Sequence, residues 1–261
     1  MSDGRTRVLI VEDEPDMNNL VAQVLSAYGY EPVQARSGEQ ALLILSERLP
    51  DAVLLDLMLP GLSGYEVCRR LKGNRATNLI PVLMLTALDR NVDRRHGYET
   101  GADDYVTKPF TPQGLVSRLQ ACVAQYREAK SANDHLVLQC DLGTALATLK
   151  ALNTLTSALY SRTAIPPDPI EALRTGLLRL ADAAEEWAIV HGGVPPAQVD
   201  IEFDPHRLRL VFRAPNPAGK EFLCLHLAPE APVPAELTDA GMLDRVCMED
   251  STVIYEKALS P

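Results

Sequence analysis

Polar side chains suited to phosphoryl chemistry stand at the ends of four short apolar runs. Glu12 and Asp13 follow the run RVLIV, and the other runs end in Asp56, Thr86 and Lys108. Carboxylate oxygens are preferred ligands of Mg²⁺, and the bound ion keeps a neighbouring aspartate ionised and nucleophilic. A lysine beside that aspartate stabilises charge on a phosphoryl group in transfer. The set predicts transfer of a phosphoryl group to Asp56.

The same residues supply a metal site. We expect Mg²⁺ (or Mn²⁺) to be bound, with waters, by four protein ligands: the carboxylates of Glu12, Asp13 and Asp56 and the backbone carbonyl of Met58.

Alternating strands and helices must position these side chains. The expected strands of residues 1–129 are 7–11, 31–35, 52–56, 81–86 and 104–108. Between them, apolar residues recur at helical spacing, as in 16–30 and 37–50, and Ser37 offers an N-cap. This order predicts an α/β fold, a flavodoxin-like doubly wound five-stranded parallel sheet. Ligands of such sheets bind beyond the carboxyl ends of the strands, where the polar residues collect.

The motifs VLIVEDE, LLDLMLPGLSG, LTA and DDYVTKPF resemble the receiver domain of two-component response regulators, over residues 5 to about 127. The resemblance implies these roles: Mg²⁺ binding by Glu12 and Asp13, phosphorylation of Asp56, hydrogen bonding to the phosphoryl group by Thr86, and ion pairing with it by Lys108. It also implies a sensor histidine kinase as partner, an aromatic switch at Tyr105 and a cis bond between Lys108 and Pro109.

Phosphorylation of Asp56 is expected to act as a switch. It adds roughly −1.5 to −2 charge to a site that already holds several carboxylates. Thr86 is expected to move toward the phosphoryl group and Tyr105 to rotate inward behind it, which shifts the balance between two surface states. The predicted output surface is the face made by helix four, strand five and helix five.

The composition indicates which binding partners and which cellular location to expect. The chain has 261 residues and a net charge of −10, divided as −3 for residues 1–129 and −7 for the rest. An acidic chain repels a phosphate backbone, so nucleic-acid binding is not expected. The five cysteines show no metal-binding spacing, and neither a signal peptide nor a membrane span is visible. We therefore expect a cytoplasmic protein without membrane insertion.

Residues 130–261 predict a second domain, a two-layer α/β sandwich with two long helices and a mixed or antiparallel sheet. The expected strands are 135–140, 198–203, 207–213, 221–227 and 251–259. The expected helices are 142–161, a segment from Asp168 or Pro169 to the stop at Gly192 and Gly193, and a short one over 238–248.

This order of elements resembles the GHKL ATPase fold in its small anti-sigma-factor kinase form. In that family, a glutamate and an asparagine one turn apart, just before a His-Gly helix end, hold Mg²⁺ against ATP. Aligned on His191 and Gly192, these positions are Ala183 and Trp187, which cannot bind a metal. The resemblance implies a degenerate output domain to which ATP is not expected to bind.

A further segment, CDLGTALATL (140–149), is similar to the histidine-kinase phosphorylation box, with Cys140 in place of the histidine. This similarity implies an inactive dimerisation helix. The leucine stripe from Leu146 to Leu159 fits either a domain core or an exposed two-helix face, so a homodimer stays open.

The leading hypothesis is a response regulator whose phosphorylation on Asp56 switches a non-catalytic, GHKL-like domain that binds a downstream protein partner. No enzyme activity is expected beyond autophosphorylation and dephosphorylation of the receiver. Three alternatives stay open: an active ATP-binding protein kinase or anti-sigma regulator that uses Asp182, Glu185 and Glu186, a DNA-binding transcriptional regulator, and a phosphorelay adaptor.

Overall fold

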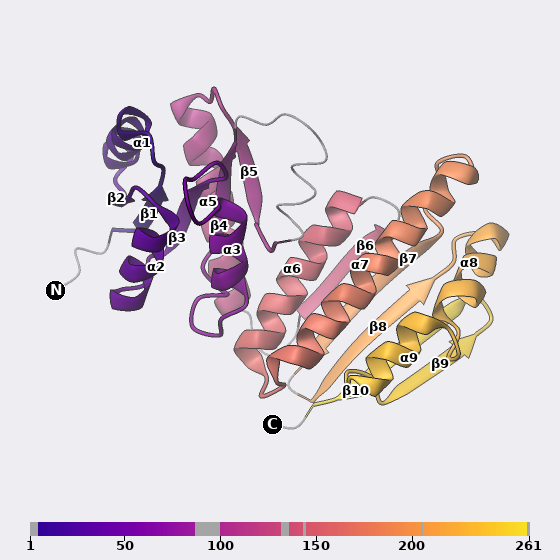
Figure 1. The fold of residues 1–261 in the computed structure, drawn as a ribbon. Helices are drawn as coiled ribbons and strands as arrows, with labels where there is room; N and C mark the ends of the chain where they lie inside the picture. The colour runs from indigo at the N-terminus through magenta and orange to yellow at the C-terminus, as the bar shows by residue number, and fades with distance from the viewer. Residues whose placement is uncertain (1–4, 87–99, 132–135, 143–144, 205, 260–261) are drawn as a thin grey trace. The chain divides into compact units, whose positions relative to one another are not determined.

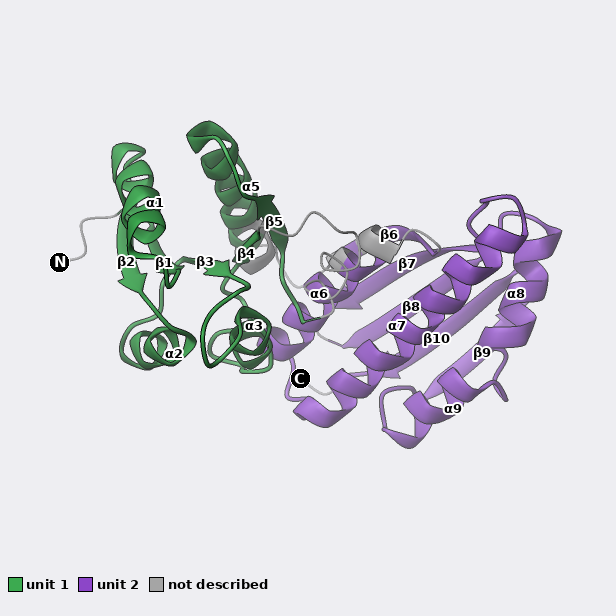
Figure 2. Ribbon diagram, turned by 45° about the horizontal axis from the view of Figure 1, so that its top comes forward, with its two compact units in different colours: residues 1–131 green, residues 132–261 purple. Residues whose placement is uncertain are grey.

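The computed structural model describes residues 5–86, 100–131, 136–142, 145–204 and 206–259. The chain divides into two compact units, residues 1–131 and 132–261 (Figure 2). Each unit has its own hydrophobic core. We describe each unit by itself.

The first unit is a five-stranded parallel sheet in the order β2-β1-β3-β4-β5, with helices on both faces (Figure 1). Its strands are β1 (Arg7–Val11), β2 (Glu31–Ala35), β3 (Ala52–Asp56), β4 (Val82–Thr86) and β5 (Asp104–Thr107). Its helices are α1 (Pro15–Ala27), α2 (Gly38–Glu47), α3 (Gly64–Lys72) and α5 (Pro112–Ser131). The predicted fold class is confirmed. Residues 87–99, where helix four of the predicted output surface falls, lie outside the described residues.

Local signals account for the beginnings of two helices in this unit. The hydroxyl groups of Ser37 and Ser63 accept hydrogen bonds from the backbone N–H groups of Gln40 and Glu66, which caps α2 and α3. Strands β3 and β4 are buried at every position, because helices cover the sheet on both sides.

The second unit is a five-stranded antiparallel sheet in the order β6-β7-β8-β10-β9. Its strands are β6 (Leu136–Leu142), β7 (Ala197–Asp204), β8 (Arg207–Arg213), β9 (Arg245–Glu249) and β10 (Thr252–Ala258). Its helices are α6 (Ala145–Arg162), α7 (Pro167–Val190), α8 (Pro217–Leu227) and α9 (Pro232–Asp239). All four helices contribute to one core against the sheet (Figure 1).

Two predictions for this unit are wrong. Residues 221–227 form the end of helix α8 rather than a strand. The predicted helix over 238–248 is not formed, because α9 ends at Asp239 and strand β9 begins at Arg245. Helix α8 forms because Asn216 caps it, Pro217 opens it, and the buried Phe222, Leu223 and Leu227 follow helical spacing. Strand β9 forms because it pairs with β10 along its whole length.

The segment similar to a phosphorylation box is divided between the predicted strand and the predicted helix, and dimerisation stays a prediction. Cys140 lies in strand β6, paired with Val199 of β7, and the helix begins only at Ala145. Leu152, Leu155 and Leu159 of that helix are buried in the core of the second unit. Within the described residues, no helix combines the length and the apolar character that a membrane span requires.

Candidate functional site

Three carboxylates meet at the carboxyl edge of the parallel sheet. Glu12 and Asp13 follow β1, and Asp56 ends the neighbouring strand β3, which pairs with β1 up to Val11 and Leu55. One oxygen from each of the three acids lies within 4.8 Å of the others. Glu12 and Asp56 are buried, whereas Asp13 is exposed, so the cluster opens to solvent on one side.

Lys108 completes this cluster from the end of β5. Its Nζ donates to Asp56 Oδ2 at 2.5 Å and to Glu12 Oε2 at 2.6 Å. Burial alone would lower the pKa of Lys108, but the hydrogen bonds and negative charges of Asp56 and Glu12 outweigh burial and raise it. Lys108 is therefore a fixed cation beside both acids.

The pKa of the Glu12 carboxyl group is raised above its ordinary value. Burial raises the pKa of its carboxyl group, and the charge of Asp56 raises it further, although the hydrogen bond from Lys108 opposes both. A divalent cation would relieve the repulsion between Glu12 and Asp56, since it adds positive charge where the acids converge.

The remaining predicted receiver residues lie on β4 and β5 or directly after β5. Thr86 ends β4, is 1% exposed, and accepts a hydrogen bond from the Lys108 N–H through its carbonyl oxygen at 2.7 Å. The Lys108–Pro109 bond is cis. Tyr105 lies in β5 opposite Met84 and is 5% exposed, so its ring is already inside the unit in this structure. Its rotation on phosphorylation stays a prediction.

The residues at the edge fit a hard divalent cation. Three carboxylates supply oxygen ligands, and the exposed Asp13 leaves the cluster accessible to solvent. The Met58 N–H donates to Asp56 Oδ1 at 3.0 Å, which orients that carboxylate. Ligation by the Met58 carbonyl stays a prediction.

Sequence reasoning missed two residues that shape the site. Asn18, near the start of α1, donates side-chain hydrogen bonds to the carbonyl oxygens of Glu12 and Ala35. Gly64 starts α3 so close to β3 that a Cβ there would lie 2.1 Å from the Asp56 carbonyl oxygen. The glycine eight residues after Asp56 was visible in the sequence, but its close contact depends on how α3 packs.

The end of α7 in the second unit presents aromatic rather than acidic groups. The Trp187 ring stacks on His191 at 4.3 Å between centroids and meets Phe222 of α8 edge-on at 5.7 Å. A cavity of about 200 Å³ beside them is lined by Trp187, His191, Val194, Pro196 and residues 216–219. Asp182, Glu185 and Glu186 do not line it, and among the described residues only the Glu12 cluster groups three potential metal ligands.

Cys140 is not poised to act as a nucleophile. Burial and the adjacent Asp141 raise the pKa of its thiol to about 11, although a hydrogen bond with Thr148 opposes the shift. The thiol therefore stays protonated at neutral pH, in the form that does not attack electrophiles.

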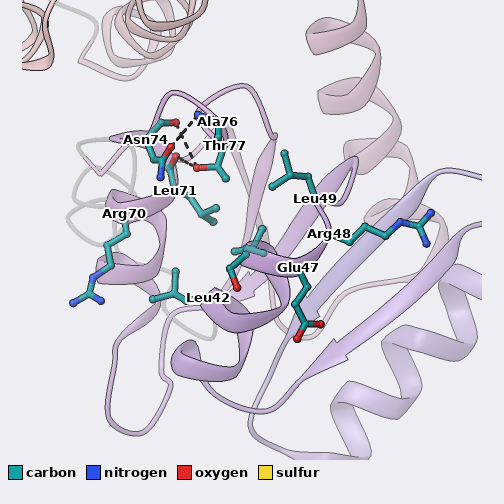
Figure 3. Close-up of a pocket in the computed structure, with 11 residues that line it drawn as sticks. Leu42, Glu47, Arg48, Leu49, Arg70, Leu71, Asn74, Ala76 and Thr77 are labelled. Atoms are coloured by element: carbon teal, nitrogen blue, oxygen red, sulfur yellow. Dashed lines mark hydrogen bonds between the residues drawn. The ribbon is translucent and has the colours of Figure 1, made fainter.

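A larger hollow of about 440 Å³ lies in the first unit between the C-terminal parts of α2 and α3 (Figure 3). Its two arginines, Arg48 and Arg70, extend away from one another, so they do not form one anion site. Arg70 is ion-paired with Glu66, and Thr77 donates its hydroxyl to the Leu71 carbonyl. None of the predicted site residues lines this hollow.

Comparison with known proteins places the first unit in a family. Residues 8–120 match the family model described as the response regulator receiver domain. The chain is 48% identical over 118 residues to the phosphate regulon transcriptional regulatory protein PhoB of Pseudomonas aeruginosa, a match over 45% of this chain and 51% of that protein. It is 46% identical over 121 residues to the DNA-binding response regulator MtrA of Mycolicibacterium smegmatis, over 46% and 52% of the two chains.

Among solved structures, a response regulator of Chloroflexus aurantiacus is 41% identical, with a TM-score of 0.45, over 46% of this chain and 98% of that one. The chain spans about half the length of the curated relatives it matches. Residues 8–120, which the family model matches, all belong to the first unit.

Proposed function

Because residues 8–120 form a response regulator receiver domain, we propose that this protein is a response regulator that a sensor histidine kinase phosphorylates on Asp56. The observation that carries the proposal is the cluster of Glu12, Asp13 and Asp56 with Lys108 bound to two of its acids. In this cluster Asp56 is the acid that touches both the lysine and the Met58 N–H.

Each residue of the cluster has a role in the transfer. Glu12, Asp13, Asp56 and the carbonyl of Met58 would hold Mg²⁺, and the bound ion would supply positive charge beside the phosphoryl oxygens. An Asp56 carboxylate oxygen attacks phosphorus as the bond from phosphorus to the donor breaks, and the donor leaves as the kinase's imidazole or, with acetyl phosphate, as acetate. Lys108 stabilises the phosphoryl charge that builds up beside it. Thr86 ends the neighbouring strand β4, and its hydroxyl group donates a hydrogen bond to a phosphoryl oxygen.

Phosphorylation by acetyl phosphate tests this proposal. The full chain with Mg²⁺ should gain one phosphate, seen as a retarded band on a phosphate-affinity gel and lost on treatment with hydroxylamine. Asp56→Asn should abolish the band, whereas Asp16→Asn, a change at an exposed acid of α1, should retain it. Equal labelling of wild type and Asp56→Asn would refute Asp56 as the acceptor.

For the second unit we propose a non-catalytic, GHKL-like domain that acts through binding of a partner protein. Support comes from the α7 end, where Ala183 packs against the core and Trp187 stacks on His191. The cavity there, about 200 Å³, is smaller than the roughly 300–1,000 Å³ of small-molecule sites. A site for ATP and its metal needs more room and acidic or amide ligands.

Calorimetry with ATP and Mg²⁺ tests the non-catalytic assignment. No heat of binding attributable to the second unit is expected, and micromolar affinity that survives Asp56→Asn would contradict the assignment. Such binding would favour the active ATP-binding kinase among the alternatives. Labelled phosphate on a histidine would favour the phosphorelay adaptor.

DNA binding is the second candidate for the output, and the curated relatives favour it. PhoB and MtrA are named as transcriptional or DNA-binding regulators, although the similarity covers only their receiver halves. Residues 132–261 carry 10 basic and 18 acidic residues, a balance that opposes nonspecific attraction to DNA. A gel-shift titration of the phosphorylated chain on genomic fragments at two salt concentrations separates the candidates. Salt-dependent, phosphorylation-dependent retardation would establish DNA binding and displace the protein-binding proposal.

A further inference from the structure

Asn18 is a buried polar residue directly behind the acidic cluster. It lies near the start of α1 and is 1% exposed. Its Nδ2 group donates to the carbonyl oxygen of Glu12 at 2.8 Å and to that of Ala35 at 2.9 Å. These two carbonyl groups stand at the carboxyl ends of β1 and β2, so one side chain ties two strands and a helix together at the edge that carries the acids.

The bond to Glu12 matters most for the site. The carbonyl group of Glu12 belongs to the planar peptide that joins Glu12 to Asp13, and a rotation of this plane would move Asp13. On the other side of Glu12, its N–H donates to the Ala35 carbonyl at 3.1 Å, beyond the last β1–β2 pair. The N–H and the carbonyl group of Glu12 are therefore both hydrogen-bonded. The bond from Asn18 fixes the carbonyl group, which is the one that belongs to the peptide leading to Asp13.

Packing alone does not explain an asparagine at position 18. Its Oδ1 atom is buried and accepts no hydrogen bond from any residue that the structure describes. An unsatisfied buried acceptor costs free energy, whereas an apolar side chain of similar size would not carry one. The hydrogen bonds from Nδ2 to the two carbonyl groups explain why an asparagine stands there.

We propose that Asn18 is a positioning residue for the metal, because it fixes the peptide between Glu12 and Asp13 so that both carboxylates face the ion. This inference rests on the Mg²⁺ site proposed above. Residues that orient metal ligands without touching the ion typically contribute 10- to 100-fold to metal affinity, through hydrogen bonds of this kind. Loss of the Asn18 carboxamide should reduce the free energy of Mg²⁺ binding more than it reduces the free energy of unfolding.

Calorimetric titration of the full chain with MgCl₂ at constant ionic strength tests the proposal. Asn18→Leu should raise the Mg²⁺ dissociation constant by about tenfold, in line with the effect of ligand-orienting residues. Asn19→Leu is the matched control, because Asn19 is the next residue of the same helix but is exposed, and its Oδ1 accepts from the side chain of Gln34. At saturating Mg²⁺, phosphorylation of Asn18→Leu by acetyl phosphate should recover most of the wild-type rate.

The outcomes separate a positioning role from a purely structural one. If Asn18→Leu lowers the melting temperature but binds Mg²⁺ as tightly as wild type at 20 °C, the inference is overturned while the metal site stands. If wild type itself binds no Mg²⁺, the proposed metal site fails and the inference fails with it. Should Asn18→Leu not fold, Asn18→Ser, which also removes the carboxamide, is titrated instead with the same expected result.

Discussion

At the scale of residues, Lys108 joins two acids that would otherwise repel each other. Its Nζ lies within 2.6 Å of oxygens from both Glu12 and Asp56, and none of these three side chains is fully exposed. A phosphoryl group arriving on Asp56 adds negative charge beside this lysine. Lys108 would therefore lie close enough to pair with a phosphoryl group on Asp56.

The raised pKa of Glu12 predicts a pH dependence of stability. The folded chain holds the Glu12 proton more tightly than the unfolded chain, whose carboxyl group has the ordinary value of 4.5. This contribution to stability is present below pH 4.5 and is lost as pH rises through the higher pKa of the folded state. In EDTA, urea denaturation should show the wild type losing stability over this range relative to Glu12→Gln. Parallel pH profiles for the two proteins would contradict the expectation.

At the scale of elements, the start of α3 packs directly on the end of β3. A Cβ atom at position 64 would lie 2.1 Å from the Asp56 carbonyl oxygen and 2.9 Å from Leu57 Cα, both backbone atoms that cannot move aside cheaply. The Gly64 N–H also donates to the Leu57 carbonyl at 3.2 Å. The helix and the strand that carries Asp56 therefore hold each other in place.

Gly64→Ala should damage both stability and chemistry. Overpacking of this kind typically costs about 1–3 kcal/mol of unfolding free energy, and the shift of β3 should slow phosphate incorporation from acetyl phosphate. Gly73→Ala, whose added Cβ meets only the Arg69 carbonyl at 3.2 Å, is the control and should change both quantities less. Unchanged labelling kinetics in Gly64→Ala would show that Asp56 does not depend on this contact.

The cap of α8 gives a prediction for the second unit. Asn216 Oδ1 accepts from the Gly219 N–H at 2.8 Å, so Asn216→Ala should cost about 1 kcal/mol of stability. Trp187 is the chain's one tryptophan and lies in this unit, so its fluorescence in urea reports the loss. Ser37→Ala removes the cap of α2 in the first unit and should leave the Trp187 transition unchanged.

At the scale of the whole molecule, the chain consists of two units with separate hydrophobic cores. The core around Leu54 and Leu83 draws all its members from the first unit, and the core around Phe212 and Tyr255 draws its members from the second. A domain with its own core can fold alone. The division therefore predicts that the phosphoacceptor chemistry belongs to the first unit by itself.

A fragment of residues 1–131 should fold cooperatively and accept phosphate. Its urea midpoint, followed by circular dichroism, should match the transition of the first unit in the full chain, and labelling by acetyl phosphate should proceed at a similar rate. Asp56→Asn in the fragment is the negative control. A fragment that is unfolded in buffer would show that the first unit depends on the second for stability.

Sequence patterns were enough to predict the fold of the first unit and the side chains that meet at its carboxyl edge. Short apolar strands alternating with amphipathic helices allow little other than a parallel sheet, and a parallel sheet brings the ends of its strands to one edge. Glu12, Asp13, Asp56 and Lys108 could therefore be predicted as neighbours before any coordinates were known. Ser37 could also be predicted as a cap, because capping depends only on local chain geometry.

Features that depend on contacts between distant segments could not be predicted in this way. The stretch EFLCLHL suits either a strand or a helix by its own pattern, and the cap at Asn216 together with core packing selects the helix. The hold of Asn18 on Glu12 and Ala35, and the closeness of Gly64 to Asp56, arise where separate elements meet. Periodicity shows which face of an element is buried, but it does not show which atoms meet there, because close packing is decided by all the neighbours together.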